Sequence, residues 1–151
     1  MSEAASTRKR YRGQAVDVSF DPVRCQHAAE CLRGLPAVFD TGRRPWILPD
    51  GADPDDVVRV VARCPTGALR THPVAPAAGE EPVTPTEVIA RPGGPMLLRG
   101  DLHVTGPGGV DEHEIRAALC SCGSTANAPY CDGGGTCADW PHPHQGSTAA
   151  G

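Results

Sequence analysis

The feature that most constrains this chain is its set of seven cysteines, which fall into two groups with unrelated spacing. Four lie within residues 119–137, in LCSCGSTANAPYCDGGGTC, and three lie in the first half of the chain. An odd number of thiols fits poorly with a closed set of disulfides. No apolar segment follows the basic N-terminal residues, so we expect no secretory signal and a reducing, cytoplasmic compartment. Metal ligation is therefore the expected role of the cysteines, which are Cys25, Cys31, Cys64, Cys120, Cys122, Cys131 and Cys137.

The composition indicates a small apolar core, so the metal sites have to contribute to the stability of the fold. The 151 residues include 18 glycines and 16 prolines, and only 4% are aromatic. Small domains with little apolar burial depend on other cross-links. We expect no membrane partner, because no stretch approaches the roughly 20 apolar residues of a membrane span. We also expect no nucleic-acid partner, although the N-terminal tail is basic.

The chain is expected to contain two ordered parts joined by a linker. Residues 14–71 and residues 87–140 have regular elements, whereas Pro, Ala and Glu dominate residues 72–86, as in a semi-extended linker. We predict that residues 1–13, a basic tail, and residues 141–151 are disordered.

Local patterns in residues 14–71 predict the order β-α-β-β-α-β, which is that of the ferredoxin-like unit. Val16, Val18 and Phe20 alternate with polar residues, as in a half-buried strand. Asp53 is a good N-cap, with Pro54 at the first helical position. The predicted strands are 15–20, 37–40, 46–48 and 68–71, and the predicted helices are 27–33 and 54–63.

Glycine-rich turns divide the second part into short predicted strands, so the expected class of the whole chain is α+β. These turns lie at 93–95, at Gly100 and at 106–109. The last strand leads directly into Cys120. The predicted strands are 88–91, 96–99, 102–105 and 115–119.

The first cysteine set follows part of a ferredoxin pattern. Clostridial-type ferredoxins use C-x2-C-x2-C-x3-C-P, whose last cysteine serves another cluster. Cys25 and Cys31 match the first and third cysteines, Ala28 stands at the second, and Leu35-Pro36 replaces the Cys-Pro. The remote ligand is kept as Cys64, which is followed by a proline. One cluster is implied, not two.

The segments CQHAAECLRGLPAVFD, RRPWILPD and CPTGAL together resemble a divergent family of single-cluster ferredoxin-like domains, over about residues 12–71. The resemblance implies a ferredoxin fold around a 3Fe-4S or 4Fe-4S cluster. Three thiolates suit a 3Fe-4S cluster directly, whereas a 4Fe-4S cluster needs a fourth ligand, for which His27 is the nearest candidate. The alternatives are a solvent-facing His27 and three buried, inert thiols.

The second cysteine set closely resembles the CDGSH iron–sulfur family, whose pattern is C-x-C-x2-[ST]-x3-P-x-C-D-G-[SAT]-H. The upstream sequence EVIARPGGPMLLRGDLHV is also similar to the strands that precede this motif, so the resemblance covers about residues 86–140. It implies a small β-rich domain that forms a homodimer and holds a 2Fe-2S cluster with three cysteines and one histidine. The matching positions are Cys120, Cys122, Thr125, Pro129, Cys131, Asp132 and Gly133.

The chain departs from that family at the histidine ligand, which is replaced by Gly135. Cys137 is the natural substitute, because thiolate suits iron–sulfur sites better than carboxylate and the preceding glycines let the backbone fold back. Four cysteines are the ordinary ligands of a 2Fe-2S cluster. Structural zinc is the main rival, although zinc ribbons favour paired C-x2-C knuckles. The other ligand candidates are Asp132, His142 and His144, and Cys137 is then a free thiol.

No catalytic constellation or phosphate-binding loop accompanies these cysteines. We therefore expect an electron carrier rather than an enzyme, with a reductase or oxidoreductase as redox partner and a homodimer formed through the CDGSH-like domain. The cofactors would be one 2Fe-2S cluster and one 3Fe-4S or 4Fe-4S cluster. Other classes to be tested are a protein that delivers clusters or iron, a redox sensor, and a zinc-stabilised binding module.

Overall fold

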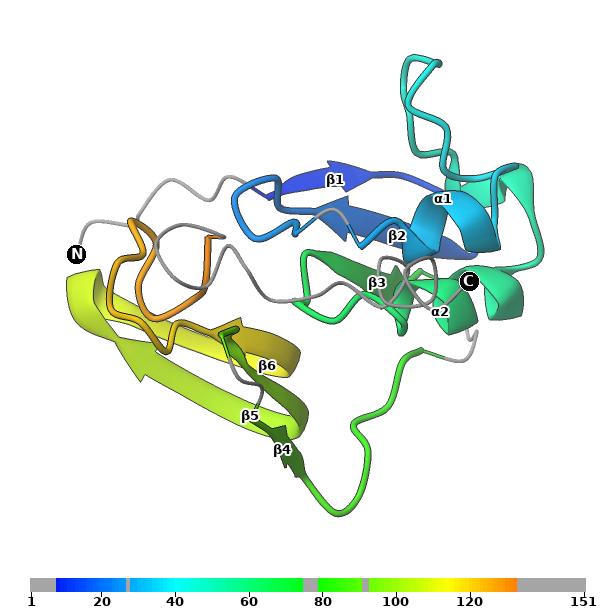
Figure 1. Cartoon of the computed structure of the whole chain (residues 1–151). Helices are drawn as coiled ribbons and strands as arrows, with labels where there is room; N and C mark the ends of the chain where they lie inside the picture. The colour runs from blue at the N-terminus through cyan, green and yellow to red at the C-terminus, as the bar shows by residue number, and fades with distance from the viewer. Residues whose placement is uncertain (1–7, 27, 75–78, 91–92, 133–151) are drawn as a thin grey trace, which may run out of the picture.

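The computed structural model describes residues 8–26, 28–74, 79–90 and 93–132. Within these ranges the chain forms two three-stranded antiparallel sheets, and both α-helices belong to its first half (Figure 1). The class is therefore α+β, as predicted. The expectations for His27 and for Cys137 concern positions outside the described residues.

The N-terminal sheet has the order β1-β2-β3, with β1 at Lys9–Tyr11, β2 at Val16–Phe20 and β3 at Leu69–Pro73. β2 lies in the centre and pairs antiparallel with both neighbours. The alternation in its sequence places Val16 and Val18 in the apolar core, at 2% and 0% exposure. The strand was therefore predicted correctly from its pattern.

Part of the segment predicted as a disordered basic tail is ordered in the structure. Its strand β1 pairs with β2 over three residues. The basic side chains find partners there: Arg10 Nε lies 2.9 Å from the buried Asp17 carboxylate, and Arg8 donates hydrogen bonds to the carbonyl oxygens of Gly67 and Ala68. These contacts, which cross to distant parts of the chain, order residues 8–13.

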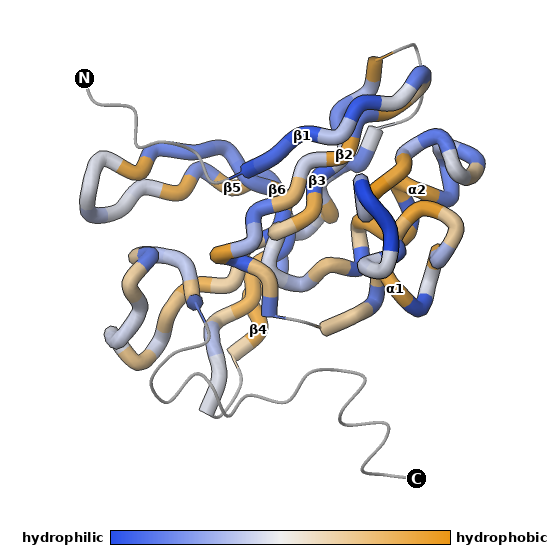
Figure 2. Tube along the Cα trace, turned by 90° about the horizontal axis from the view of Figure 1, so that it is seen from above, coloured by the Kyte–Doolittle hydropathy of each residue, from blue (hydrophilic) through white to orange (hydrophobic). Residues whose placement is uncertain are grey.

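The helices cover one face of this sheet and close its core. α1 spans Glu30–Gly34, the 3-10 helix η1 spans Pro49–Gly51, and α2 spans Pro54–Val61. The Asp53 side chain accepts a hydrogen bond from the backbone N–H of Asp55, which confirms its role as N-cap. The apolar face of α2 turns toward β2 and β3, as the hydropathy colouring in Figure 2 shows. Among the described helices, none has the length and apolar character needed to cross a membrane.

The two middle strands predicted for a ferredoxin-like sheet are reduced to one bridge, between Phe39 and Ile47. The bridge is flanked by hydrogen bonds from Asp40 N to Trp46 O and from Leu48 N to Val38 O. Prolines at positions 45 and 49 lack the N–H that a longer ladder needs. The full β-α-β-β-α-β sheet is therefore not observed, because these residues form a minimal hairpin beside the sheet.

The C-terminal sheet has the order β4-β5-β6 and is dominated by one long hairpin. β4 spans Glu87–Ile89, β5 spans Met96–Gly106, and β6 spans Val110–Leu119, with the 3-10 turn η2 at Pro107–Gly109. Gly100, predicted as a turn, lies inside β5 where the register shifts between Arg99 and Leu102. The two segments predicted as separate strands therefore form one strand with a bulge. A Cβ on Gly100 would lie 2.5 Å from the Thr86 hydroxyl, so a larger residue at this position would collide with Thr86.

The two sheets meet through β3 and β6, which lie side by side in Figures 1 and 2. Arg116 of β6 donates a hydrogen bond to the carbonyl oxygen of Leu69, and Glu114 lies 3.6 Å from Arg70 of β3. Glu80, in the segment predicted as a linker, forms an ion pair with Arg116. The joining segment thus contributes directly to the contact between the halves.

Candidate metal centres

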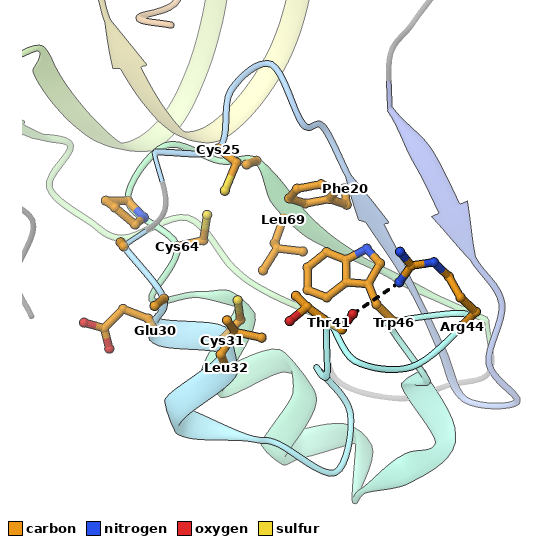
Figure 3. Close-up of a pocket in the computed structure, with 14 residues that line it drawn as sticks. Phe20, Cys25, Glu30, Cys31, Leu32, Thr41, Arg44, Trp46, Cys64 and Leu69 are labelled. Atoms are coloured by element: carbon orange, nitrogen blue, oxygen red, sulfur yellow. Dashed lines mark hydrogen bonds between the residues drawn. The ribbon is translucent and has the colours of Figure 1, made fainter. Parts of the chain in front are cut away.

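The three cysteines of the first set come from three separate segments and line one cavity (Figure 3). Cys25 lies in the loop after β2, Cys31 lies in α1, and Cys64 follows α2. The cavity has a volume of about 360 Å³. The fold therefore gathers thiols that are up to 39 residues apart in the sequence, as the spacing predicted.

The rest of the cavity wall is largely apolar. Phe20 and Trp46 pack edge to face with their ring centroids 5.0 Å apart, and Leu69 lies between these rings and the thiols (Figure 3). Ala28, which stands where ferredoxins have their second cysteine, also lines the cavity. The Glu30 carboxylate points away from the thiols in Figure 3 and pairs with Arg33. Among the described residues, the thiols are thus the soft donors that this cavity offers.

Burial disfavours deprotonation of Cys31. It raises the pKa of Cys31 to about 12, and the neighbouring thiols of Cys64 and Cys25 add to this effect. Each thiolate makes the next one harder to form, because like charges in a poorly solvated space repel. Iron binds thiolate, so loading this site has to release protons.

The arrangement fits a polynuclear cluster better than a single ion. No group of three or more His, Cys, Asp or Glu side chains in the described part of the chain is placed to hold one metal ion. The three thiols instead surround a cavity, as ligands of a cluster with several iron atoms must. None of the cysteines that the structure describes forms a disulfide.

The second site is built by the loop that follows β6. Cys120 and Cys122 have their sulfur atoms 3.7 Å apart, and both pack against the small apolar cluster of Leu97, Ala118 and Cys131. The backbone N–H of Gly123 donates a hydrogen bond to Cys120 Sγ. Gly123 has a φ of +80°, a conformation that favours glycine and turns this N–H toward the sulfur.

Backbone pairing returns the loop to the strand and places Cys131 beside the other two thiols. Leu119 and Tyr130 form an antiparallel bridge. Cys120 N donates to Pro129 O, and Cys131 N donates to Ala118 O, each at 2.8 Å. Cys131 is 1% exposed. The described residues therefore supply three closely grouped thiols from the sequence motif.

Two other motif residues hold the loop in shape. The Thr125 hydroxyl donates a hydrogen bond to Tyr130 O at 2.6 Å, and Asp132 Oδ2 accepts one from Ala126 N at 2.9 Å. These contacts give Thr125 and Asp132 a role in loop geometry. They also engage the Asp132 carboxylate, which is one of the alternative ligands for the fourth position.

The sequence reasoning missed the residues that join the two sites. Arg24 and Gln26 flank Cys25, and both are buried against the second half of the chain. Arg116 contacts the Cys64 carbonyl oxygen from β6. The sequence did contain one indication of this contact, which is the pair of polar residues on either side of Cys25. Residues next to a buried ligand are themselves often buried, and a buried polar side chain needs a hydrogen-bond partner.

One titrating group of the N-terminal sheet gives a testable pH dependence. Burial, together with the positive charges of Arg10, Arg70 and Arg8, lowers the pKa of His72 from 6.5 to about 4. The unfolded chain therefore binds this proton more readily, and stability should fall as the pH drops from about 6.5 to about 4. We expect His72→Gln, which keeps a partner for the Ser19 hydroxyl, to lose less stability over that range. Urea midpoints of cluster-free protein measure this, and equal losses in the two proteins would contradict it.

The two thiol sets, each in its own half of the chain, and two matching family models define a protein that binds iron–sulfur clusters. Two family models match the chain: the divergent 4Fe-4S mono-cluster model over residues 11–72, and the iron-binding zinc finger CDGSH type model over residues 93–134. The chain belongs to the divergent 4Fe-4S mono-cluster family and carries a CDGSH-type segment in its second half.

Two curated relatives match part of the chain. The "Uncharacterized protein YjdI" of Escherichia coli strain K12 is 45% identical over 60 residues, which make up 40% of this chain and 79% of the relative. The protein of the same name in Escherichia coli O157:H7 matches to the same extent. No solved structure shows a significant match.

Proposed function

We propose that the chain is a one-electron carrier with two iron–sulfur sites. The observation that carries this proposal is the gathering of Cys25, Cys31 and Cys64 around one apolar cavity, in a chain whose second half presents a separate thiol group. In the described part of the first cavity, no acid or base is directed at the thiols. This supports electron storage rather than catalysis on a bound substrate.

For the first site we propose a 4Fe-4S cluster held by Cys25, Cys31 and Cys64. The description of the matching family supports this nuclearity over a 3Fe-4S cluster. The fourth iron would then take a ligand other than these cysteines, and His27 stays the nearest candidate in the sequence. The apolar wall of Phe20, Trp46 and Leu69 would limit water access at this site.

For the second site we propose a 2Fe-2S cluster held by Cys120, Cys122, Cys131 and Cys137. The grouping of the first three thiols supports the assignment, and the sequence pattern supports the fourth. Bound clusters supply the one-electron chemistry, while the chain holds and tunes them. The Gly123 N–H that donates to Cys120 Sγ would stabilise extra negative charge on the sulfur and so favour the reduced state.

Partner and assembly are part of the same proposal. A carrier needs a donor and an acceptor, which we propose to be a reductase or an oxidoreductase. We also propose a homodimer through the second half, on the resemblance to CDGSH proteins. Val88, Ile89 and Met96 are exposed apolar side chains of β4 and β5 that could support such a contact.

Analysis of iron, sulfide and zinc in anaerobically purified protein, with EPR spectroscopy before and after reduction by dithionite, tests the proposal. We expect iron and sulfide in equal amounts and two reversible reductions with the clusters retained. Rapid transfer of the second cluster to an apo-ferredoxin would favour the delivery class instead. Zinc without iron and sulfide would overturn the proposal.

A further inference from the structure

The contact between the two halves includes several close chain neighbours of the cysteines. On one side these are Arg24 and Gln26, which flank Cys25, and the Thr66–Gly67 turn, which follows Cys64 and Pro65. On the other side they include Tyr130 and Cys131 itself. The loops that present the thiols are therefore also the loops that bring the halves together.

Arg24 is the centre of this contact. It is buried, and its Nη1 atom lies 2.7 Å from the buried Glu114 carboxylate of β6. Its Nη2 atom donates to Thr66 O at 2.8 Å, beside the loop of Cys64. Its guanidinium lies 4.0 Å from the ring centroid of Tyr130, the residue before Cys131. One side chain thus contacts the loops of both sites.

A second arginine ties the first site to β6 from the opposite direction. Arg116 is buried and forms a two-point ion pair with Glu80, with both N–O distances at 2.6 Å. Its Nη1 atom donates to the carbonyl oxygen of Cys64, and its Nη2 atom donates to Leu69 O. The planar guanidinium holds these acceptors in a defined geometry.

Gln26 connects the two thiol sets through one hydrogen bond. Its side-chain Nε2 donates a hydrogen bond of 3.2 Å to the carbonyl oxygen of Cys131, and the side chain is 8% exposed. Gln26 directly follows Cys25 in the chain. The route from the Cys25 sulfur to the Cys131 sulfur is therefore covalent except for one buried hydrogen bond.

Close approach of the two backbones depends on Gly67. Its φ is +74°, and a Cβ at this position would lie 2.2 Å from the carbonyl oxygen of Arg116 and 2.8 Å from Arg24 Nη2. Both the conformation and the space require glycine. The Gly of the CPTGAL segment thus lets the loop of Cys64 lie directly against β6.

We propose that this contact is an inter-site coupler, in which Gln26 is the positioning residue that links the two sites for electron exchange within one chain. The proposal rests on the proposed function, since both sites must hold clusters. In the exchange one electron leaves the reduced site and enters the oxidised site, no bond forms or breaks, and an external one-electron reductant supplies the electron. The arginine contacts and Gly67 set the distance between the two sites. The Gln26 hydrogen bond supplies the direct route for the electron.

The arrangement is tested by EPR of the fully reduced protein with Gly67→Ala and Arg99→Ala. The Arg99 side chain also bridges the halves, through a hydrogen bond to Ala62 O, but it contacts neither a cysteine nor its carbonyl, so it is the matched control. We expect spin–spin interaction between the two signals in the wild type and in Arg99→Ala, and loss of it in Gly67→Ala. A wild-type spectrum that is the simple sum of two isolated signals would overturn the proposal.

The route is tested with Gln26→Met, which keeps the length of the side chain and removes the donor. A light flash in the presence of a flavin and a sacrificial electron donor generates the flavin semiquinone, a one-electron reductant. Absorbance then follows redistribution of the electron between the sites. We expect a rate independent of protein concentration in the wild type and in Arg99→Ala, and a slower rate in Gln26→Met with the EPR interaction retained. Equal rates in Gln26→Met and the wild type, or a rate proportional to protein concentration, would refute the proposed route.

A measurement on the full chain as purified, whatever metal its sites hold, separates this proposal from the proposed function. Hydrogen exchange of the Gln26 side-chain amide, followed by NMR, should be slow in the wild type and fast in Gly67→Ala. Fast exchange in the wild type would show that the halves are not joined at Gln26, whatever metal the sites hold. Slow exchange in a protein that binds only zinc would retain the contact but rule out electron exchange.

Discussion

Arg116→Met is expected to lower the free energy of unfolding by about 3–5 kcal/mol, the usual cost of removing one partner from a buried ion pair. The substitution would leave the Glu80 carboxylate, which is 9% exposed, without its cation. It would also remove the donors to the carbonyl oxygens of Cys64 and Leu69. Because small domains are stable by only about 5–15 kcal/mol, a substantial part of the folded population is at risk.

Urea unfolding of cluster-free protein, followed by circular dichroism, measures this loss. The matched control is Arg59→Met, because Arg59 also pairs with a carboxylate, that of Asp56, but is 61% exposed. Exposed pairs of this kind contribute less than about 1 kcal/mol. Similar losses in the two variants would show that the Arg116 contact is not buried in solution.

Serine substitutions in the two thiol sets are expected to remove one cluster each. Cys64→Ser should abolish the cluster of the first site, because only two cysteine ligands remain there. Cys137→Ser should abolish or sharply destabilise the cluster of the second site, since Gly135 offers no ligand in place of the family's histidine. Loss is expected in each case because hydroxyl is a poor substitute for the soft thiolate that iron–sulfur clusters require.

Iron and sulfide content, with EPR of the reduced protein, distinguishes the two variants. Each serves as the control for the other, because the signal of the unaltered site should persist. A normal second cluster in Cys137→Ser would place the fourth ligand elsewhere, with His142 and His144 as the remaining candidates in the sequence. Loss of both clusters from either variant would show that the sites cannot be filled independently.

Local patterns predicted the elements in which apolar residues recur with the period of a strand or a helix. β2 was found from its alternation, and α2 from the Asp53-Pro54 start and its valine face. The two groups of cysteines were recognised because their spacings in the sequence match known ligand patterns. The sequence predicted a turn at Gly100, whereas the structure has a bulge inside β5. Glycine is common in turns and in bulges, so the residue type alone does not distinguish the two. The close contact between Gly100 and the Thr86 side chain is seen only in the structure.

The contact between the sites could not be predicted in the same way. Glu114 and Arg116 occupy one face of β6, and alternating charged residues are typical of the solvent-facing side of a strand. Glu114 pairs with Arg24, which is 90 residues away in the sequence, and Arg116 pairs with Glu80, which is 36 residues away. Local periodicity carries no information about such a distant partner, so the burial of these two charged residues was not predicted.

The segment that connects the two halves includes Glu80, which itself takes part in the contact between them. The two halves are therefore tethered to each other within a single chain. Association of tethered partners is governed by an effective concentration, which is about millimolar for short flexible linkers. Each apolar cluster of the described residues lies within one half, and the contact consists mainly of arginine hydrogen bonds. Two separate chains would have to offset the full loss of translational and rotational freedom with these contacts. The tether removes most of that cost, which allows a polar contact to hold two redox sites together.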